Sequence, residues 1–134
     1  MSFMASLAAR DTARLEARHG DVDRALQLLD ETVASFHRGG ELPNVAATIA
    51  SLTVLFDRLE RPAVAATLLG ITMDHSRGTV VIDVPTLVAR FRSRLGDTTT
   101  DAAITAGTHM DLAAGVRYAH EQIAIVQRER AQQS

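Results

Sequence analysis

Apolar side chains recur every three or four residues along almost the whole chain, which is the period of an α-helix that buries one face. Helices of this kind must pack against one another, because each has an apolar stripe to cover. No segment keeps the two-residue alternation of a half-buried β-strand. The stripes are Val22, Ala25, Leu26, Leu29, Val33 and Phe36; Val45, Ile49, Leu52, Phe56 and Leu59; Val64, Leu68 and Leu69; Leu87, Val88, Phe91 and Leu95; and Leu112, Val116, Ala119, Ile123 and Val126.

Turn-forming and capping residues divide the chain into about seven helices. Residues 98–101 are expected to form a capping box for the sixth helix, and Gly107 is expected to end that helix. The polar tail at residues 128–134 is expected to fray. The predicted boundaries lie at Gly20 with Asp21, Gly39 with Gly40, Pro43, Arg61 with Pro62, Asp83 with Pro85, Gly96, Gly107 and Asp111.

These patterns predict an all-α fold of stacked antiparallel helical hairpins in one compact domain. Residues 20–25 (GDVDRA) have the glycine-to-alanine spacing of the central turn in a tetratricopeptide repeat, and a related stretch follows about 41 residues later. We therefore expect tetratricopeptide-like hairpins over residues 1–76 and a C-terminal helical cap over residues 77–134. The short apolar run at residues 79–82 is predicted to be a loop held by its apolar side chains.

Composition and charge exclude several classes of function. The chain has no cysteine and no lysine, which excludes disulfides, thiolate metal sites, a lysine Schiff base and a P-loop lysine. A formal net charge of -2 and an aromatic content of 4% disfavour nucleic-acid binding. No apolar run is long enough for a membrane helix. We expect a cytoplasmic chain without a cofactor, a bound metal or a direct nucleic-acid contact.

Four segments together resemble a known family through their order and spacing. They are residues 19–36, 52–70, 84–97 and 104–119. They resemble the C-terminal helical-repeat region of large bacterial LuxR-type transcriptional regulators, signalling ATPases and adenylate-cyclase–ATPase fusions. Two positions depart from the family pattern: Ile104 stands where tryptophan is common, and Asp111 stands where serine or threonine is common, a change that keeps the helix cap.

The resemblance implies that this chain is the sensor or scaffold portion of such a regulator. In those proteins a nucleotide-binding switch module precedes the helical region, and a DNA-binding helix-turn-helix often follows it. This chain has neither a P-loop nor a basic recognition helix at its end. The expected partner is therefore the ATPase module of a parent protein, or another protein.

The histidines invite a metal-site interpretation, but their spacing disfavours it. No two of the five histidines stand three or four residues apart, so none form a metal-binding pair on one helix face. A site would require His109, Asp111 and His120 to meet through a fold-back of the last turn. The alternative is solvated histidines near helix ends, where His19 and His37 would complement the helix dipole.

Two other polar clusters allow both a chemical and a structural interpretation. Arg90, Arg92 and Arg94 could bind a phosphate or an acidic partner, or form a solvated last helical turn, and the acidic net charge favours the latter. The spacing places Arg90 and Arg94 on one face and Arg92 on another. Residues 74–76 (Asp-His-Ser) suggest a hydrolase, but adjacent side chains diverge along a helix and cannot form a triad.

We interpret the chain as a non-enzymatic interaction or sensor module. The free end of a repeat array exposes an apolar face, so the first helix is expected to meet a neighbour or a second copy in a homodimer. The apolar seam of the last helix would cap the hairpins, or would also pack against another chain. The predicted interaction residues are Phe3, Met4, Leu7, Leu112, Val116, Ile123 and Val126.

Three other functions compete with this interpretation. A small-molecule sensor would need an apolar cavity between helices. An unrecognised enzyme would need a cleft with clustered ionisable groups, and a DNA-contacting domain would bind in a salt-dependent manner. The residues small enough to leave a cavity are Ala65, Ala66, Gly70, Ala102, Ala103 and Ala106.

Overall fold

The computed structural model describes residues 3–76 and 82–133, and every regular element within those ranges is an α-helix. The all-α fold class is thus confirmed for the described residues. Of the loop predicted at residues 79–82, only Ile82 is described, and it packs against the core. The helices are α1 (Phe3–His19), α2 (Val22–Arg38), α3 (Leu42–Arg58), α4 (Pro62–His75), α5 (Val84–Leu95), α6 (Asp97–Thr108) and α7 (Leu112–Gln133).

Aspartate side chains cap three of the helices. Asp21, Asp83 and Asp111 each accept a hydrogen bond from a backbone amide three residues further on, at 3.0, 3.2 and 2.8 Å respectively. Such a bond satisfies an amide that has no partner within the helix. The Thr86 hydroxyl also donates to Asp83, and these hydrogen bonds lower the pKa of the Asp83 carboxyl. The boundaries predicted at these residues are confirmed.

Three predicted details of the helix ends are wrong. α6 begins at Asp97 without a side-chain cap, and Asp101 pairs with Arg92 rather than completing a capping box. Gly107 does not end α6, because it is a buried position inside the helix. The tail does not fray before Gln133, since α7 remains helical up to that residue.

α2 and α3 end in the same way, although their sequences differ there. In both, the residue after the C-cap has a positive φ, and its amide and the following one bond back to carbonyls of the last turn. That residue is Gly40 after α2, with φ 70°, and Glu60 after α3, with φ 62°. Only glycine adopts this conformation without steric cost, so the α3 end holds a strained backbone.

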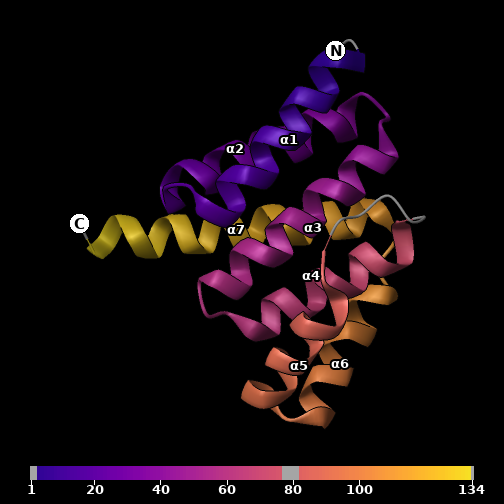
Figure 1. The fold of residues 1–134 in the computed structure, drawn as a ribbon, viewed down its shortest axis with the longest axis vertical. Helices are drawn as coiled ribbons and strands as arrows, with labels where there is room; N and C mark the ends of the chain where they lie inside the picture. The colour runs from indigo at the N-terminus through magenta and orange to yellow at the C-terminus, as the bar shows by residue number, and fades with distance from the viewer. Residues whose placement is uncertain (1–2, 77–81, 134) are drawn as a thin grey trace.

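The first two helical pairs lie side by side, with α1 parallel to α3 (Figure 1). The Ser6 hydroxyl donates to Glu41 Oε1 at 2.7 Å, and Arg10 donates to Asn44 Oδ1 at 3.1 Å. These partners are 35 and 34 residues apart in the chain. The two helices therefore begin at the same end of the molecule.

The end of α5 meets the end of α3 in a similar register. Arg90 pairs with Asp57 at 2.5 Å, and Arg94 pairs with Glu60 at 3.5 Å. These partners are 33 and 34 residues apart. A step of nearly constant length thus separates the facing positions of α1, α3 and α5.

α4 and α6 cross in direct backbone contact. A Cβ atom added to Gly70 would lie 2.1 Å from the carbonyl oxygen of Ile104, and one added to Gly107 would lie 2.1 Å from that of Thr67. The two backbones therefore touch, with no room for any side chain. Gly115 makes a related contact on α7, where an added Cβ would lie 2.8 Å from the Ile71 side chain.

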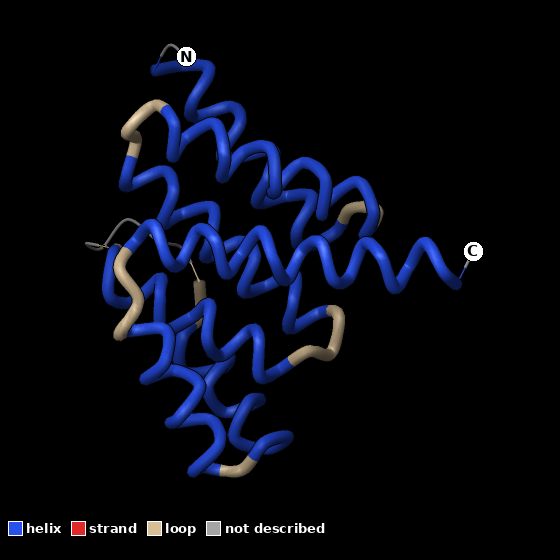
Figure 2. Tube along the Cα trace, turned by 180° about the vertical axis from the view of Figure 1, so that it is seen from behind, coloured by secondary structure: helices blue, strands red, loops and turns tan. Residues whose placement is uncertain are grey.

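α7 does not pack along its chain neighbour α6. It contacts α2, α3 and α4 instead, and crosses the middle of the molecule behind α3 in Figure 1. Figure 2 shows it from the other side, between the α1–α2 pair and the α5–α6 pair. The core beneath these helices is formed by apolar side chains of all the predicted stripes, including the fully buried Phe36, Phe56 and Phe91.

A glycine at position 60 should stabilise the protein. We expect Glu60→Gly to raise the free energy of unfolding by up to about 1 kcal/mol, because it relieves the positive φ while it adds some entropy to the unfolded chain. Gly40→Ala should lower it by about 1 kcal/mol, since no atom lies within 4 Å of the added Cβ and only the backbone cost remains. Urea unfolding of both variants measures this. A lower free energy of unfolding for Glu60→Gly would contradict the claim that the positive φ at Glu60 strains the backbone.

Alanine at the α4–α6 crossing should separate the two helices. We expect Gly70→Ala and Gly107→Ala each to lower the free energy of unfolding by about 3 kcal/mol, because the added methyl group overlaps backbone atoms that cannot move alone. Gly39→Ala is the matched control, since its added Cβ meets the flexible Glu41 side chain at 3.2 Å and the Ser35 carbonyl oxygen at 3.4 Å, which is an ordinary van der Waals distance. Equal melting temperatures for all three variants would show that the crossing tolerates a side chain.

Candidate interaction surface

α1 carries two of the most exposed large apolar side chains among the described residues. Met4 is 73% exposed and Leu15 is 57% exposed. Ala8 and Asp11 are also exposed and lie between them at a four-three-four spacing. The four residues therefore form one stripe along the helix, which we call the outer face of α1.

The buried side of α1 is made of smaller residues than its outer face. Ser6 is 3% exposed, and Ala13 and Ala17 are fully buried against the rest of the core. Small side chains let α1 approach α2 and α3 closely. A surface helix normally buries its larger apolar residues, so α1 has the reverse arrangement.

The other predicted residues at the two ends of the chain lie in different environments. Leu7 and Leu112 are partly buried. Phe3 is described only as the first residue of α1. α1 and α7 do not pack along each other in the described structure, so the two predicted groups do not form one surface.

The apolar seam of α7 points into the molecule. Val116 is 4% exposed, Ile123 is fully buried and Val126 is 2% exposed. The seam contacts α2, α3 and α4, so it caps the helices of its own chain. The half-buried Tyr118 also belongs to this contact, where burial raises the pKa of its phenol and a hydrogen bond with Thr67 partly offsets that effect.

Polar side chains at both edges of α7 tie it to α2 and α4. His120 Nδ1 lies 2.5 Å from Asp30 Oδ1, and Arg130 Nε donates to Asp23 Oδ1 at 2.6 Å. The hydrogen bond with Asp23 raises the pKa of the Arg130 guanidinium. On the other edge, the Glu129 carboxylate accepts from Arg61 at the start of α4, and we call the contacts of His120, Glu129 and Arg130 the α7 clamp.

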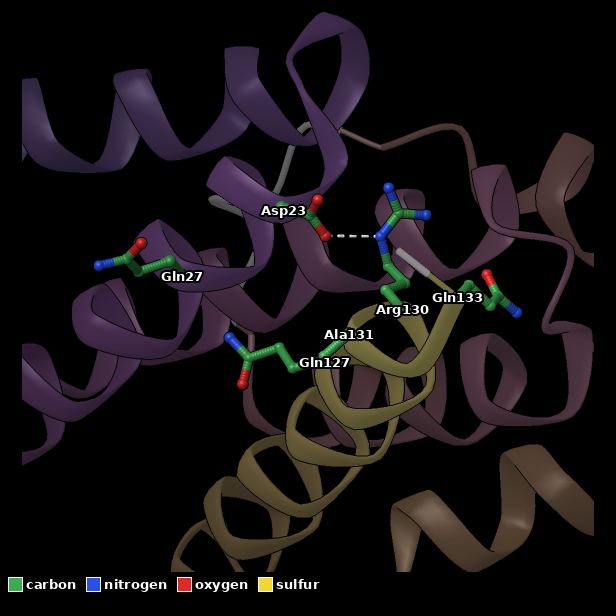
Figure 3. A pocket seen from close by; sticks show the side chains of 6 residues that line it. All are labelled: Asp23, Gln27, Gln127, Arg130, Ala131 and Gln133. Atoms are coloured by element: carbon green, nitrogen blue, oxygen red, sulfur yellow. Dashed lines mark hydrogen bonds and ion pairs between the residues drawn. The ribbon is translucent and has the colours of Figure 1, made fainter.

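An open polar cleft lies between the start of α2 and the end of α7. Figure 3 shows Arg130 directed at Asp23 on one side of it, while the amides of Gln27 and Gln127 point elsewhere. Small-molecule sites are usually enclosed and largely apolar. This cleft has neither property, and we assign it no ligand. Its lining residues are Asp23, Gln27, Gln127, Arg130, Ala131 and Gln133.

The three clustered arginines of α5 pair with carboxylates of the same chain. Arg90 and Arg94 contact acidic residues at the end of α3, as their shared face predicts. Arg92 lies on the other face and contacts Asp97 at 3.3 Å and Asp101 at 2.8 Å. The cluster therefore joins α5 to its neighbours.

The structure separates the residues considered for metal binding. His120 pairs with α2, while His109 is the C-cap residue of α6. Among residues 3–76 and 82–133, no three histidine, aspartate or glutamate side chains come close enough to hold a metal ion.

The Asp-His-Ser segment lies at the end of α4. His75 Nε2 hydrogen bonds with the Met110 carbonyl oxygen at 3.0 Å, and Asp74 Oδ2 lies 3.6 Å from the same nitrogen. The ring thereby joins the end of α4 to the turn before α7. Ser76 is the C-cap residue of α4, and its amide donates to the Thr72 carbonyl.

Five of the six small residues that could have left a cavity divide into two groups, and the sixth, Ala103, is partly buried against the core. Ala65, Ala66 and Gly70 are buried in α4, where the backbone of α6 fills the adjacent space at Gly70. Ala102 and Ala106 are exposed on the far side of α6. The small side chains at this crossing permit close helix contact.

Sequence reasoning missed Leu15 and both carboxylate partners on α2. Leu15 could have been found, because it continues the spacing of Met4, Ala8 and Asp11. Asp23 and Asp30 gave no such signal, since their partners on α7 are 107 and 90 residues away.

Comparisons with known proteins do not place the chain in a family. No protein-family model, no curated protein and no solved structure matches it. None of the described helices combines the length and the apolar character that a membrane crossing requires.

Proposed function

We propose that this chain is a non-catalytic helical interaction module of a bacterial signalling or transcription regulator, with a tetratricopeptide-like arrangement of its hairpins. It acts by contacts with another protein or with other parts of a parent ATPase. The link to LuxR-type regulators and signalling ATPases rests on the order and spacing of the four sequence segments described above.

The register of the helices supports the tetratricopeptide-like part of the proposal. Cross-helix partners on α1 and α3 are 35 and 34 residues apart, and those at the ends of α3 and α5 are 33 and 34 apart. A tetratricopeptide repeat is about 34 residues long and pairs two antiparallel helices. Facing positions thus recur at the repeat length, although the whole hairpins are longer.

The outer face of α1 is the observation that carries the interaction role. In an array of hairpins, each hairpin buries one side against the hairpin before it. α1 is the outermost helix of the described array and presents Met4 and Leu15 on the side where such a neighbour would pack. A protein surface that docks here would cover both side chains and leave the small residues of α1 against α2 and α3.

The proposed occupant of this face is a helix of the same kind. The four-three-four spacing of the stripe is the spacing of a helix–helix seam. A helix from a parent protein or from a second copy of this chain can supply the matching seam. Binding there would shift a parent protein between states only if the two states offer different contacts.

Self-association through the outer face of α1 should depend on its two large side chains. We expect light scattering after size-exclusion chromatography to show a mass that rises with protein concentration. The double variant Met4→Gln with Leu15→Gln should stay monomeric, because it removes the apolar surface without disturbing the buried side of α1.

Met73→Gln is the control for this measurement. Met73 is 50% exposed, but it lies on α4. This variant should associate like the parent chain. A chain that remains strictly monomeric at high concentration, or a control variant that loses association equally, would contradict the assignment of the surface to α1.

A further inference from the structure

The contacts of α7 are those of a helix bound in a groove. α2 and α4 do not pack along each other in the described part of the chain, and α7 lies between them over α3. His120 pairs with Asp30 while the later residue Arg130 pairs with the earlier residue Asp23, so α7 runs antiparallel to α2. Figure 2 shows this course across the back of the molecule. Only the short turn after Thr108 joins α7 to α6.

The surface that α7 buries is a narrow seam. Its buried residues are small or branched. Val116, Ala119, Ile123 and Val126 repeat at steps of three and four, and Gly115 is buried beside the first of them. Its opposite side is polar, with Arg117, Glu121 and Arg128 exposed. An amphipathic helix that lays such a seam into an apolar groove is a common way for one protein to bind another.

The charges at the groove edges define which helix fits. α2 presents Asp30 and Asp23 along one edge, and these meet the His120 imidazole and the Arg130 guanidinium. Arg61 stands at the other edge and meets the carboxylate of Glu129. Exposed pairs of this kind add little stability, but they select the direction and register of the bound helix.

We propose that the groove between α2 and α4 is a docking site for an amphipathic helix of a partner protein, and that α7 is the internal occupant which this helix displaces. The inference rests on the proposed role as an interaction module and names the site and the partner chemistry. The fitting helix carries a seam of small and branched residues. It also carries a hydrogen-bond donor opposite Asp30, a cation opposite Asp23 and a carboxylate opposite Arg61.

Displacement requires that the partner compete with a tethered helix. The turn after α6 keeps α7 at a high effective concentration above the groove, so a free helix with the same contacts loses to it. Weakening the contacts of α7 alone shifts the competition for the groove toward the free helix. The same contacts remain open to a partner, because Asp23, Asp30 and Arg61 belong to the groove.

The test removes the three clamp side chains from α7 in the chain, while a free peptide with the sequence of α7 keeps them. The full chain carries His120→Ala, Glu129→Ala and Arg130→Ala, and the probe is a fluorescent peptide with the unchanged sequence of residues 111–133. We expect the peptide to bind this variant about tenfold more tightly than the parent chain, because three exposed pairs are each worth a factor of about two.

The matched control has the same number of alanine substitutions on the same helix. Arg117→Ala, Glu121→Ala and Arg128→Ala remove exposed side chains of α7 that lie opposite its seam. This variant should bind the peptide no better than the parent chain. Equal peptide affinity for the clamp variant, the control and the parent would overturn the proposal.

Two further measurements protect the result from a folding artefact. If the triple variant loses helical circular dichroism, Arg130→Ala alone should still tighten peptide binding about twofold. In the parent chain, hydrogen exchange should show residues 112–133 opening while α3 stays protected. Exchange of α7 only together with α3 would mean that α7 leaves the groove only on global unfolding, and would refute displacement.

The same samples separate this proposal from the broader one. The clamp variant keeps Met4 and Leu15, so its light scattering reports on the outer face of α1 independently of the groove. Peptide binding without self-association would support the groove and count against the α1 surface. Self-association, with no effect of the clamp substitutions on peptide binding, would support the α1 surface and count against the groove.

Discussion

The contact on which the rest of the structure depends is the crossing of α4 and α6, where Gly70 and Gly107 meet backbone to backbone. Such an approach brings many main-chain atoms within van der Waals distance, so it defines the position of α6 closely. It also sets where the turn after α6 lies, and the hydrogen bond from His75 to the Met110 carbonyl holds that turn at the end of α4. α7 therefore starts beside α4, and from there it runs across α3 toward α2.

The course of α7 distinguishes this chain from a simple helical array. In an open array each repeat contacts only its neighbours, and the two ends are independent. Here α7 joins the last part of the chain to the second helix, through pairs whose members are 90 and 107 residues apart. One side of the array, across α2, α3 and α4, is thus covered by the chain itself, while the outer face of α1 keeps Met4 and Leu15 exposed.

Charge has a consistent role across the molecule, which is to orient helices that apolar contacts hold together. Two arginines of α5 pair with carboxylates at the end of α3. The α7 clamp pairs with carboxylates on α2 and with an arginine before α4. Every one of these pairs is at least partly exposed, so each contributes modestly to stability. These pairs fix the register of one helix against another, because a shift of one helical turn would leave each charge without its partner.

The sequence by itself determined the helices: their apolar period, the aspartate caps at Asp21, Asp83 and Asp111, and the face shared by Arg90 and Arg94 all follow from neighbours within a few residues. Tertiary structure alone decided three features: the contact of Gly107 with the α4 backbone, the choice of α2, α3 and α4 as the surface that the α7 seam covers, and the pairing of His120 with Asp30. The physical reason is distance along the chain. Periodicity and capping are local, whereas a close crossing or an ion pair between helices depends on which remote backbone arrives there.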